Sequence, residues 1–145
     1  MKIIKYEEKY RDDMIFMILE AKNALGRVPG LNEDLLDVRK NYLEVGDIFW
    51  LAIDDNDRVI GSIGYNSIKD TDEVWLHRLF VKYNLKRQGI GSALLETAEQ
   101  YLRKQEKKIA KVHLGGKDWV ESWTRLCGIS GTAYDERIIE NKFPR

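Results

Sequence analysis

The stretch that decides the fold runs from residue 74 to residue 95 and reads VWLHRLFV (74–81), KYNL (82–85) and KRQGIGSALL (86–95). The first segment is rich in valine, leucine and aromatic residues, which predicts a strand. The last segment places apolar residues at helical spacing behind two glycines, which predicts a helix that begins near Gly89. A strand therefore runs into a basic, glycine-bearing turn that opens a helix.

That turn has the chemistry of an anion site. Gly89 and Gly91 lack side chains that would keep an anion from the backbone, and the first turn of a helix offers unpaired N–H groups and the positive end of the helix dipole. Lys86 and Arg87 add positive charge beside them, which suits a pyrophosphate. Glycines also open helices for packing reasons alone, so both interpretations stand at this point.

Two other phosphate-binding motifs do not fit the chain. A dinucleotide-binding fingerprint needs a third glycine at position 94, which is Leu94, and a place after the first strand of a βαβ unit. A P-loop needs Gly-Lys followed by Ser or Thr, and that triplet does not occur in the sequence.

The remaining sequence predicts one α+β domain over residues 1–145. Apolar periodicity and turn residues predict ten elements in the order β-α-α-β-β-β-α-β-α-β. They are a strand at 2–6, helices at 8–25 (capped by Gly26) and 32–44, strands at 48–53, 59–67 and 73–81, a helix at 89–105, a strand at 109–114, a helix at 118–126 and a strand at 134–143.

Composition excludes several classes of protein. The 145 residues are 43% hydrophobic and 33% charged, which suits one ordinary core. Twenty-four basic and twenty-four acidic side chains cancel, so no nucleic-acid partner is expected. Acidic residues gather in 44–73 and basic ones in 82–111. These are either solvated faces, or a basic site for an anionic ligand that faces an acidic site for a cationic one.

The cellular setting is also constrained. The single cysteine, Cys127, excludes an internal disulfide and a Cys-rich zinc site, and no metal is expected. The amino terminus has no signal-peptide pattern, and the longest apolar run, residues 14–19, is too short to cross a bilayer. We therefore expect a cytoplasmic protein without a membrane partner.

The pattern L-x-R-L-x-V at 76–81, followed by RQGIGS-x-LL at 87–95, resembles the acetyl-CoA-binding motif of the GNAT superfamily of N-acetyltransferases. The family pattern starts with Gln or Arg, and this chain has Lys86 there, which keeps the positive charge. The element order is also similar to that of the family over nearly the whole chain. The resemblance implies a mixed, mostly antiparallel central sheet flanked by helices.

The resemblance also implies an activity. The chain would transfer an acetyl group from acetyl-CoA, as cosubstrate, to a primary amine of a small molecule or protein by direct attack in a ternary complex. In the family, the main chain at the positions of Leu79 and Val81 pairs with pantetheine, the Leu79 amide polarises the thioester carbonyl, and amides from 87–92 hold the pyrophosphate. The implied cofactor-binding residues are Leu79, Phe80, Val81, Lys86, Arg87, Gln88, Gly89, Ile90, Gly91 and Ser92.

Two residues of this strand are candidates for the catalytic base. His77 is the candidate base, because histidine titrates near neutrality and strand alternation places it on the same face as Leu79 and Val81. Glu73 is the second candidate, since many family members have a carboxylate at the start of this strand. The non-catalytic alternatives are that His77 is a hydrogen-bonded structural histidine on a sheet face, and that Glu73 is a solvated acid at the end of a strand.

The later family motif is poorly matched. It carries a tyrosine that often protonates the leaving CoA thiolate, and no tyrosine fits within residues 119–131. Cys127 is a candidate for that general acid, and its alternative is a small buried hydrophobe. The missing tyrosine favours a second hypothesis, that the chain is a catalytically weak acyl-CoA-binding or sensor protein on the same fold. A third is a non-enzymatic interaction module with structural glycines.

The acceptor side is the least defined part. By resemblance, the helix junction at 26–30 and Trp50, Tyr65 and Trp75 line the amine site. The acidic middle of the chain suits a cationic amine such as a polyamine, a lysine or an aminoglycoside, although the run at 54–57 also fits a hairpin turn. A homodimer is a further expectation, since dimers are common among relatives.

Overall fold

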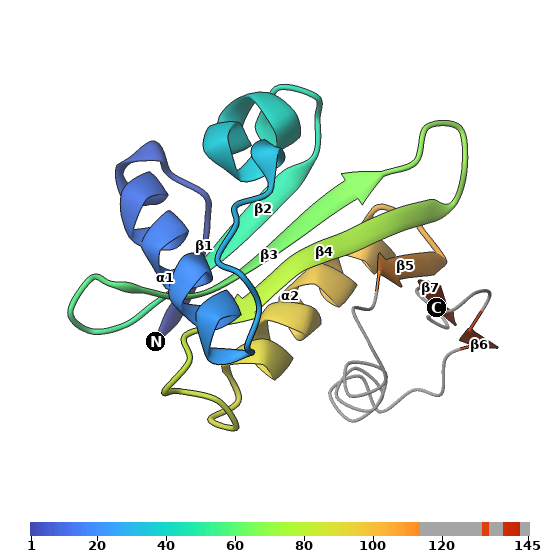
Figure 1. Ribbon diagram of the computed structural model, residues 1–145. Helices are drawn as coiled ribbons and strands as arrows, with labels where there is room; N and C mark the ends of the chain where they lie inside the picture. Colours follow the sequence, from blue (N-terminus) through green and yellow to red (C-terminus); the bar gives the residue numbers. More distant parts are fainter. Residues whose placement is uncertain (114–131, 134–137, 143–145) are drawn as a thin grey trace.

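A computed structural model of the chain describes residues 1–113, 132–133 and 138–142 (Figure 1). Its seven strands form one sheet in the order β1-β2-β3-β4-β5-β7-β6, and β4 and β5 form its only parallel pair among these residues. The strands are β1 Lys2–Lys5, β2 Ile48–Ile53, β3 Val59–Ser67, β4 Glu73–Val81, β5 Ile109–His113, β6 Thr132–Ala133 and β7 Ile138–Lys142. The expected mixed, mostly antiparallel sheet is confirmed.

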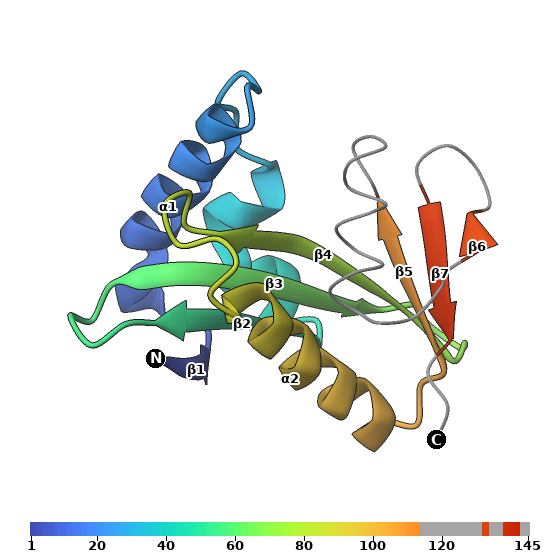
Figure 2. The same cartoon turned by 90° about the horizontal axis from the view of Figure 1, so that it is seen from below.

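Two long helices cover opposite faces of the sheet (Figures 1 and 2). Helix α1, Arg11–Ala24, follows a short 3-10 turn at Glu8–Tyr10, and α2 spans Ile90–Lys104. Each buries residues spaced three or four apart, because that spacing returns to one side of a helix. These residues are Met14, Met17, Ile18 and Ala21 in α1, and Leu94, Leu95, Ala98 and Leu102 in α2. Both helices were predicted from the same periodicity.

Helix α1 ends where its sequence predicts. Gly26 adopts a left-handed conformation with φ of 75°, and its N–H donates to Asn23 O at 3.0 Å. The N–H of Arg27 donates to Lys22 O at 3.1 Å. This pair of bonds is a Schellman cap, in which a residue without a Cβ takes the left-handed position at no steric cost.

The prediction of one regular helix over 32–44 was wrong. The segment forms a 3-10 helix, η2, at Glu33–Asp37 and a π-helical turn, η3, at Arg39–Leu43. Side chains take up hydrogen bonds that a regular helix would make within its backbone: Asp37 Oδ1 accepts from Lys40 N at 3.1 Å, and Asn41 Nδ2 donates to Asp37 O at 2.9 Å. Asp and Asn side chains compete with helical hydrogen bonds in this way.

The carboxyl-terminal part agrees in outline with the expected order. Strand β7 lies within the strand predicted at 134–143, and the two-residue strand β6 was not predicted. The helix predicted at 118–126 lies outside the described residues. In the acidic middle of the chain, Asp54 Oδ1 accepts from the N–H groups of Asn56 and Arg58 at 2.9 and 3.0 Å, so the run at 54–57 is the expected hairpin turn.

Strands β4 and β5 separate soon after they meet. They pair only through Glu73–Trp75 and Ile109–Lys111, whereas β4 continues along β3 to Val81 and β5 continues along β7. In Figure 2 the two strands start together and then point in different directions. The edge of β4 beyond Trp75 therefore faces a gap in the ladder instead of a paired β5 residue.

Candidate active site

The turn before α2 presents main-chain amides. Gly89, the N-cap of α2, and Arg87 are both left-handed, with φ of 83° and 65°. The N–H of Ala93 is the first to bond back along the helix, to Gly89 O at 3.0 Å. Within the described chain, the N–H groups of residues 90–92 have no main-chain acceptor, as expected for the first turn of a helix. They are available for an anion.

Of the predicted cofactor-binding residues, those at 86–92 form this turn and the start of α2, whereas Phe80 of β4 packs in the core under α1. Lys86, Arg87, Gln88 and Ser92 are exposed, and Ile90 and Gly91 are buried. Ile90 belongs to the core under α2. Of the implied set, the basic side chains therefore face solvent and the Ile90 side chain does not.

Helix α2 lies unusually close to the sheet at its beginning. A Cβ built on Gly61 of β3 would come within 2.8 Å of Leu94 Cδ1 and 3.0 Å of Ile90 Cγ2. A real Cβ does not approach other atoms this closely, so glycine at this position allows the first turns of α2 to pack against β3. This packing fixes the amide cluster, the N–H groups of residues 90–92, in position relative to β3.

A β-bulge interrupts β4 beside this cluster. Ser62 pairs with Phe80 but Gly64 pairs with His77, so β4 contains one more residue than β3 over this interval. Arg78 within it is left-handed, with φ of 57°. A left-handed conformation is uncommon for a residue with a Cβ, and a bulge changes which face the following side chains occupy.

The bulge corrects one expectation from the sequence. Leu79 and Val81 pack against the core under α2, whereas His77 bonds to Tyr42, which belongs to the core under α1. Strict alternation would put the three on one face, but the extra residue at Arg78 shifts the alternation. His77 is therefore on the α1 side of the sheet and not, as predicted, on the face of Leu79 and Val81.

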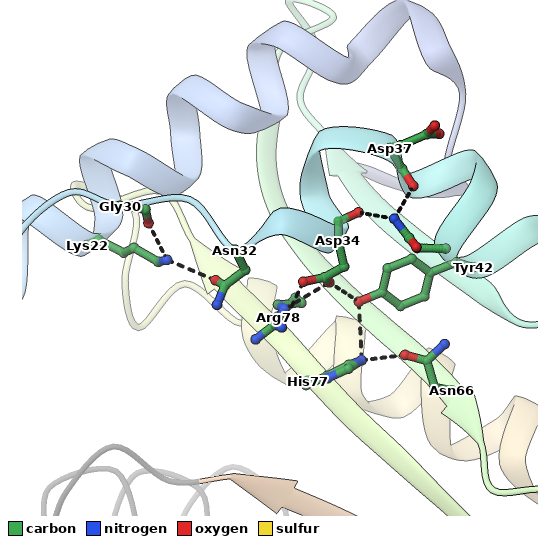
Figure 3. Close-up of polar contacts among 10 residues, drawn as sticks. Lys22, Gly30, Asn32, Asp34, Asp37, Tyr42, Asn66, His77 and Arg78 are labelled. Carbon is green, nitrogen blue, oxygen red and sulfur yellow. Dashed lines mark hydrogen bonds and ion pairs between the residues drawn. The ribbon is translucent and has the colours of Figure 1, made fainter.

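A polar network joins the bulge to η2 and η3 (Figure 3). The Arg78 guanidinium donates to both oxygens of Asp34, at 2.8 and 3.0 Å, and the Tyr42 hydroxyl donates to Asp34 Oδ2 at 2.5 Å. Burial works to raise the pKa of Asp34, but the hydrogen bonds from Arg78 and Tyr42 outweigh it and hold this pKa below its usual value. Burial and the bond to Asp34 raise the pKa of Tyr42 far above its ordinary range.

The network also defines the state of the candidate base. His77 Nε2 lies 2.6 Å from Asn66 Oδ1 and 3.2 Å from the Tyr42 hydroxyl oxygen. An amide oxygen only accepts, and the Tyr42 hydrogen is engaged with Asp34, so both contacts require Nε2 to carry the hydrogen. In the neutral ring, Nδ1 then carries the lone pair.

Glu73 lies elsewhere. Its carboxylate pairs with Lys111 Nζ at 3.5 Å, at the point where β4 and β5 run together. Four residues of strand, roughly 13 Å, separate it from His77. The structure therefore does not bring the two predicted bases together, and Cys127 lies outside the described residues.

The expected acceptor side is corrected in part. Trp50 and Tyr65 are buried, 5% and 2% exposed, and their rings meet each other and that of Tyr101 of α2 edge to face, with centroids 5.0 to 6.2 Å apart. They are core residues under α2 and do not line an open site on the side of His77. Trp75 is half-buried in β4.

The helix junction at 26–30 is exposed and is fastened to α1. Lys22 Nζ donates to Gly30 O at 2.5 Å and to Asn32 Oδ1 at 2.9 Å (Figure 3). Burial, together with the nearby charges of Arg78 and Arg27, lowers the pKa of Lys22. The junction is thus tied to the same side of the sheet as the polar network.

Several of these residues escaped the sequence analysis. Asp34, Tyr42 and Asn66 come from three separate elements, and no spacing in the sequence connects them. Arg78 does stand in the L-x-R-L-x-V pattern, which is the one signal that pointed to it. In residues 1–113 and the two short described strands, no group of three metal-ligating side chains occurs, and no helix is long and apolar enough to span a bilayer.

The comparisons with known proteins agree on one family. The family model for the acetyltransferase (GNAT) family matches residues 13–128. Mouse N-acetyltransferase 8F1 is 33% identical over 103 residues, which cover 63% of this chain and 46% of that protein. The chain thus matches less than half the length of this relative.

Solved structures show the same fold. A GNAT-family acetyltransferase from Staphylococcus aureus superposes with a TM-score of 0.84 at 20% identity, covering 99% of both chains. A GNAT-family acetyltransferase from Brucella melitensis, solved with acetyl-CoA, superposes with a TM-score of 0.70 at 17% identity over 99% of this chain and 88% of that one. The chain belongs to the GNAT acetyltransferase family, as its motif indicated.

Proposed function

We propose that this chain is an acetyl-CoA-dependent N-acetyltransferase that acetylates a primary amine. One observation carries the proposal: the start of α2 packs over Gly61 of β3, and Gly61 pairs with Val81 at the end of β4, the strand that β5 leaves after Trp75. A diphosphate at the α2 amides and an extended pantetheine arm along β4 would therefore have adjacent places to bind. The Brucella relative bound to acetyl-CoA has this fold, which supports the choice of cosubstrate. Lys86 and Arg87 would add charge near the diphosphate.

The reaction is a direct acyl transfer. The amine nitrogen forms a bond to the thioester carbon, the carbon–sulfur bond breaks, and the electron pair leaves with the CoA sulfur. The amide of Leu79 would donate to the oxygen on which negative charge develops. Holding the amine beside the thioester contributes about 7–11 kcal/mol, so positioning supplies much of the acceleration.

The amine must also lose a proton. An alkyl amine has a pKa near 10.4 and is mostly protonated at neutral pH, and a positioned base contributes about 10²–10⁴-fold. His77 is the base we propose; its ring lies on the α1 side of β4, two residues before Leu79, and its contacts to Asn66 and Tyr42 place a hydrogen on Nε2. Glu73 is the alternative base, acting from the start of β4.

The leaving thiolate needs little help. Its intrinsic pKa is near 8.5, so it departs as an anion or takes a proton from solvent. Cys127 stays a candidate for that proton donor. The acceptor, a small molecule or a protein amine, a homodimeric state and a cytoplasmic location stay predictions.

Two measurements test the proposal. Acetyl-CoA at about 100 times its dissociation constant should stabilise the chain by ~2.7 kcal/mol in thermal unfolding. Release of CoA thiol with a panel of primary amines should then identify an acceptor. Binding without turnover on any amine would favour the weak acyl-CoA-binding protein, and no binding would favour the interaction module.

Ser92 offers a matched pair of variants for the binding site. Ser92→Asp places a carboxylate in the first turn of α2, where the helix dipole favours it but a diphosphate would be repelled. Ser92→Asn has nearly the same shape without the charge. We expect the acetyl-CoA stabilisation to vanish in Ser92→Asp and to persist in Ser92→Asn; equal stabilisation in both would contradict the location of the diphosphate.

A further inference from the structure

We propose that Ser62 of β3 is a positioning residue, which aims the Leu79 amide at the thioester carbonyl by holding the peptide unit between Arg78 and Leu79. The inference rests on the proposed function, because that function makes Leu79 N–H the donor to the reacting carbonyl. Ser62 was not among the residues that the sequence singled out.

The observation is a fully buried hydroxyl at the bulge. The Ser62 side chain is 0% exposed, and its Oγ donates to the carbonyl oxygen of Arg78 at 2.8 Å. A buried hydroxyl is costly to leave without a partner, so this bond strongly favours one direction for the Arg78 carbonyl. The bond is made across the point where the β3–β4 register shifts, between Ser62 and Gly64.

The geometry of the peptide bond passes this direction on to Leu79. The carbonyl of Arg78 and the N–H of Leu79 belong to one planar unit, and the described chain contains no cis peptide. In a trans peptide the C=O and N–H point in opposite directions. Because Ser62 draws the carbonyl toward β3, the Leu79 N–H points away from β3, to the side on which β5 has left the ladder.

The other end of the same residue is held as well. Arg78 adopts a left-handed conformation that residues with a Cβ disfavour, and its guanidinium is fixed by two hydrogen bonds to Asp34. Tyr42, whose ring edge fits over Gly64, fixes Asp34 in turn. Ser62 holds the main chain of Arg78 and Asp34 holds its side chain, so the peptide plane has little freedom to turn.

Ser62→Ala removes the hydroxyl and leaves the remaining packing almost unchanged. We expect kcat to fall by about tenfold or more, since a misaimed donor loses transition-state stabilisation, with little change in affinity for CoA, which has no acyl carbonyl. Asp34→Asn weakens the contact that holds the Arg78 side chain, and it should also lower kcat. Ser67→Ala, which removes a hydroxyl of β3 that bonds to Asp47 instead, is the control and should leave kcat unchanged.

A spectroscopic measurement separates aiming from general packing. Isotope-edited infrared spectra of bound acetyl-CoA, labelled with carbon-13 at the acetyl carbonyl, report hydrogen bonding as a lowered stretching frequency. We expect the lowering in the wild type to shrink in Ser62→Ala and to persist in Ser67→Ala. An unchanged frequency with unchanged kcat in Ser62→Ala would overturn this inference alone, whereas a wild type that does not bind acetyl-CoA would overturn the proposed function and this inference with it.

Discussion

His77 and Leu79 lie two residues apart on β4 but face opposite sides of the sheet, because the left-handed Arg78 between them inserts a bulge. The side chain proposed as base is therefore on the side of α1, η2 and η3, while the amide proposed to bind the thioester lies in the strand itself. A donor and a base can then act on one carbonyl and one amine that approach β4 from different directions.

The pH dependence of the rate should reveal the base. His77→Ala should lower the rate most below about pH 8 and progressively less as the pH approaches the amine pKa near 10.4, since the free amine then needs no base. The affinity for acetyl-CoA should change little. Rate profiles of wild type and variant across this range provide the test; an equal loss at every pH would indicate a packing role.

Asp34 should contribute stability that depends on pH. Its pKa is lowered in the folded chain, so its contribution is complete above the unfolded-state pKa near 3.9 and is lost as the pH falls through the lower folded-state value. Asp34→Asn should cost about 1–3 kcal/mol in urea unfolding at pH 7, and the difference from wild type should shrink in acid. Asp55→Asn, at a fully exposed carboxylate in the hairpin turn, 3.7 Å from the amino-terminal nitrogen, is the control and should cost almost nothing.

Gly61→Ala should couple stability to cofactor binding. The added Cβ would lie 2.8 Å from Leu94 Cδ1 and 3.0 Å from Ile90 Cγ2 in a packed core, so we expect α2 to shift away from β3 and to carry the amide cluster with it. We expect a loss of about 1–3 kcal/mol in unfolding free energy and weaker binding of acetyl-CoA. Gly30→Ala, where the nearest atom to a new Cβ lies 4.0 Å away, should change neither. If Gly61→Ala is destabilised but binds acetyl-CoA with unaltered affinity, the position of α2 does not control the binding site.

Arg87→Gly should move stability and affinity in opposite directions. Glycine relieves the left-handed conformation at this position, which should stabilise the chain by about 1 kcal/mol or less, while loss of the charge should weaken acetyl-CoA binding. Asp70, an exposed residue between β3 and β4 that is left-handed with φ of 61°, gives the matched control. Asp70→Gly should gain similar stability with no change in affinity; thermal unfolding measures the first effect and calorimetric titration with acetyl-CoA measures the second.

Much of the fold was predictable from the sequence because its signals are local. The apolar spacing of α1 and α2 and the hairpin around residues 54–57 each depend on neighbouring residues, and each was predicted correctly. The segment at 33–43 was not, because Asp37 and Asn41 side chains replace backbone hydrogen bonds and divide the expected helix into two short turns. Propensity does not reveal which of the two sets of bonds prevails.

The candidate site could be predicted from the sequence only where it lies in one continuous stretch. The glycines and basic residues at 86–91 point to an anion, and they do surround the start of α2. The bulge at Arg78 has no such signal, because nothing in the sequence distinguishes a left-handed arginine from any other arginine in a strand. Ser62 and Asp34 act on it from distant parts of the chain, and only the folded arrangement shows the connection.

The short ladder between β4 and β5 is a mechanically weak connection within the sheet. Three residue pairs, reinforced by the ion pair of Glu73 with Lys111, are the ladder connection between its two halves in the part of the chain that the structure describes. An extended ligand that pairs with the edge of β4 beyond Trp75 would hold the two halves of the sheet together more firmly. Amide hydrogens of β5, and not only those of β4, should then exchange more slowly with solvent once the ligand is bound.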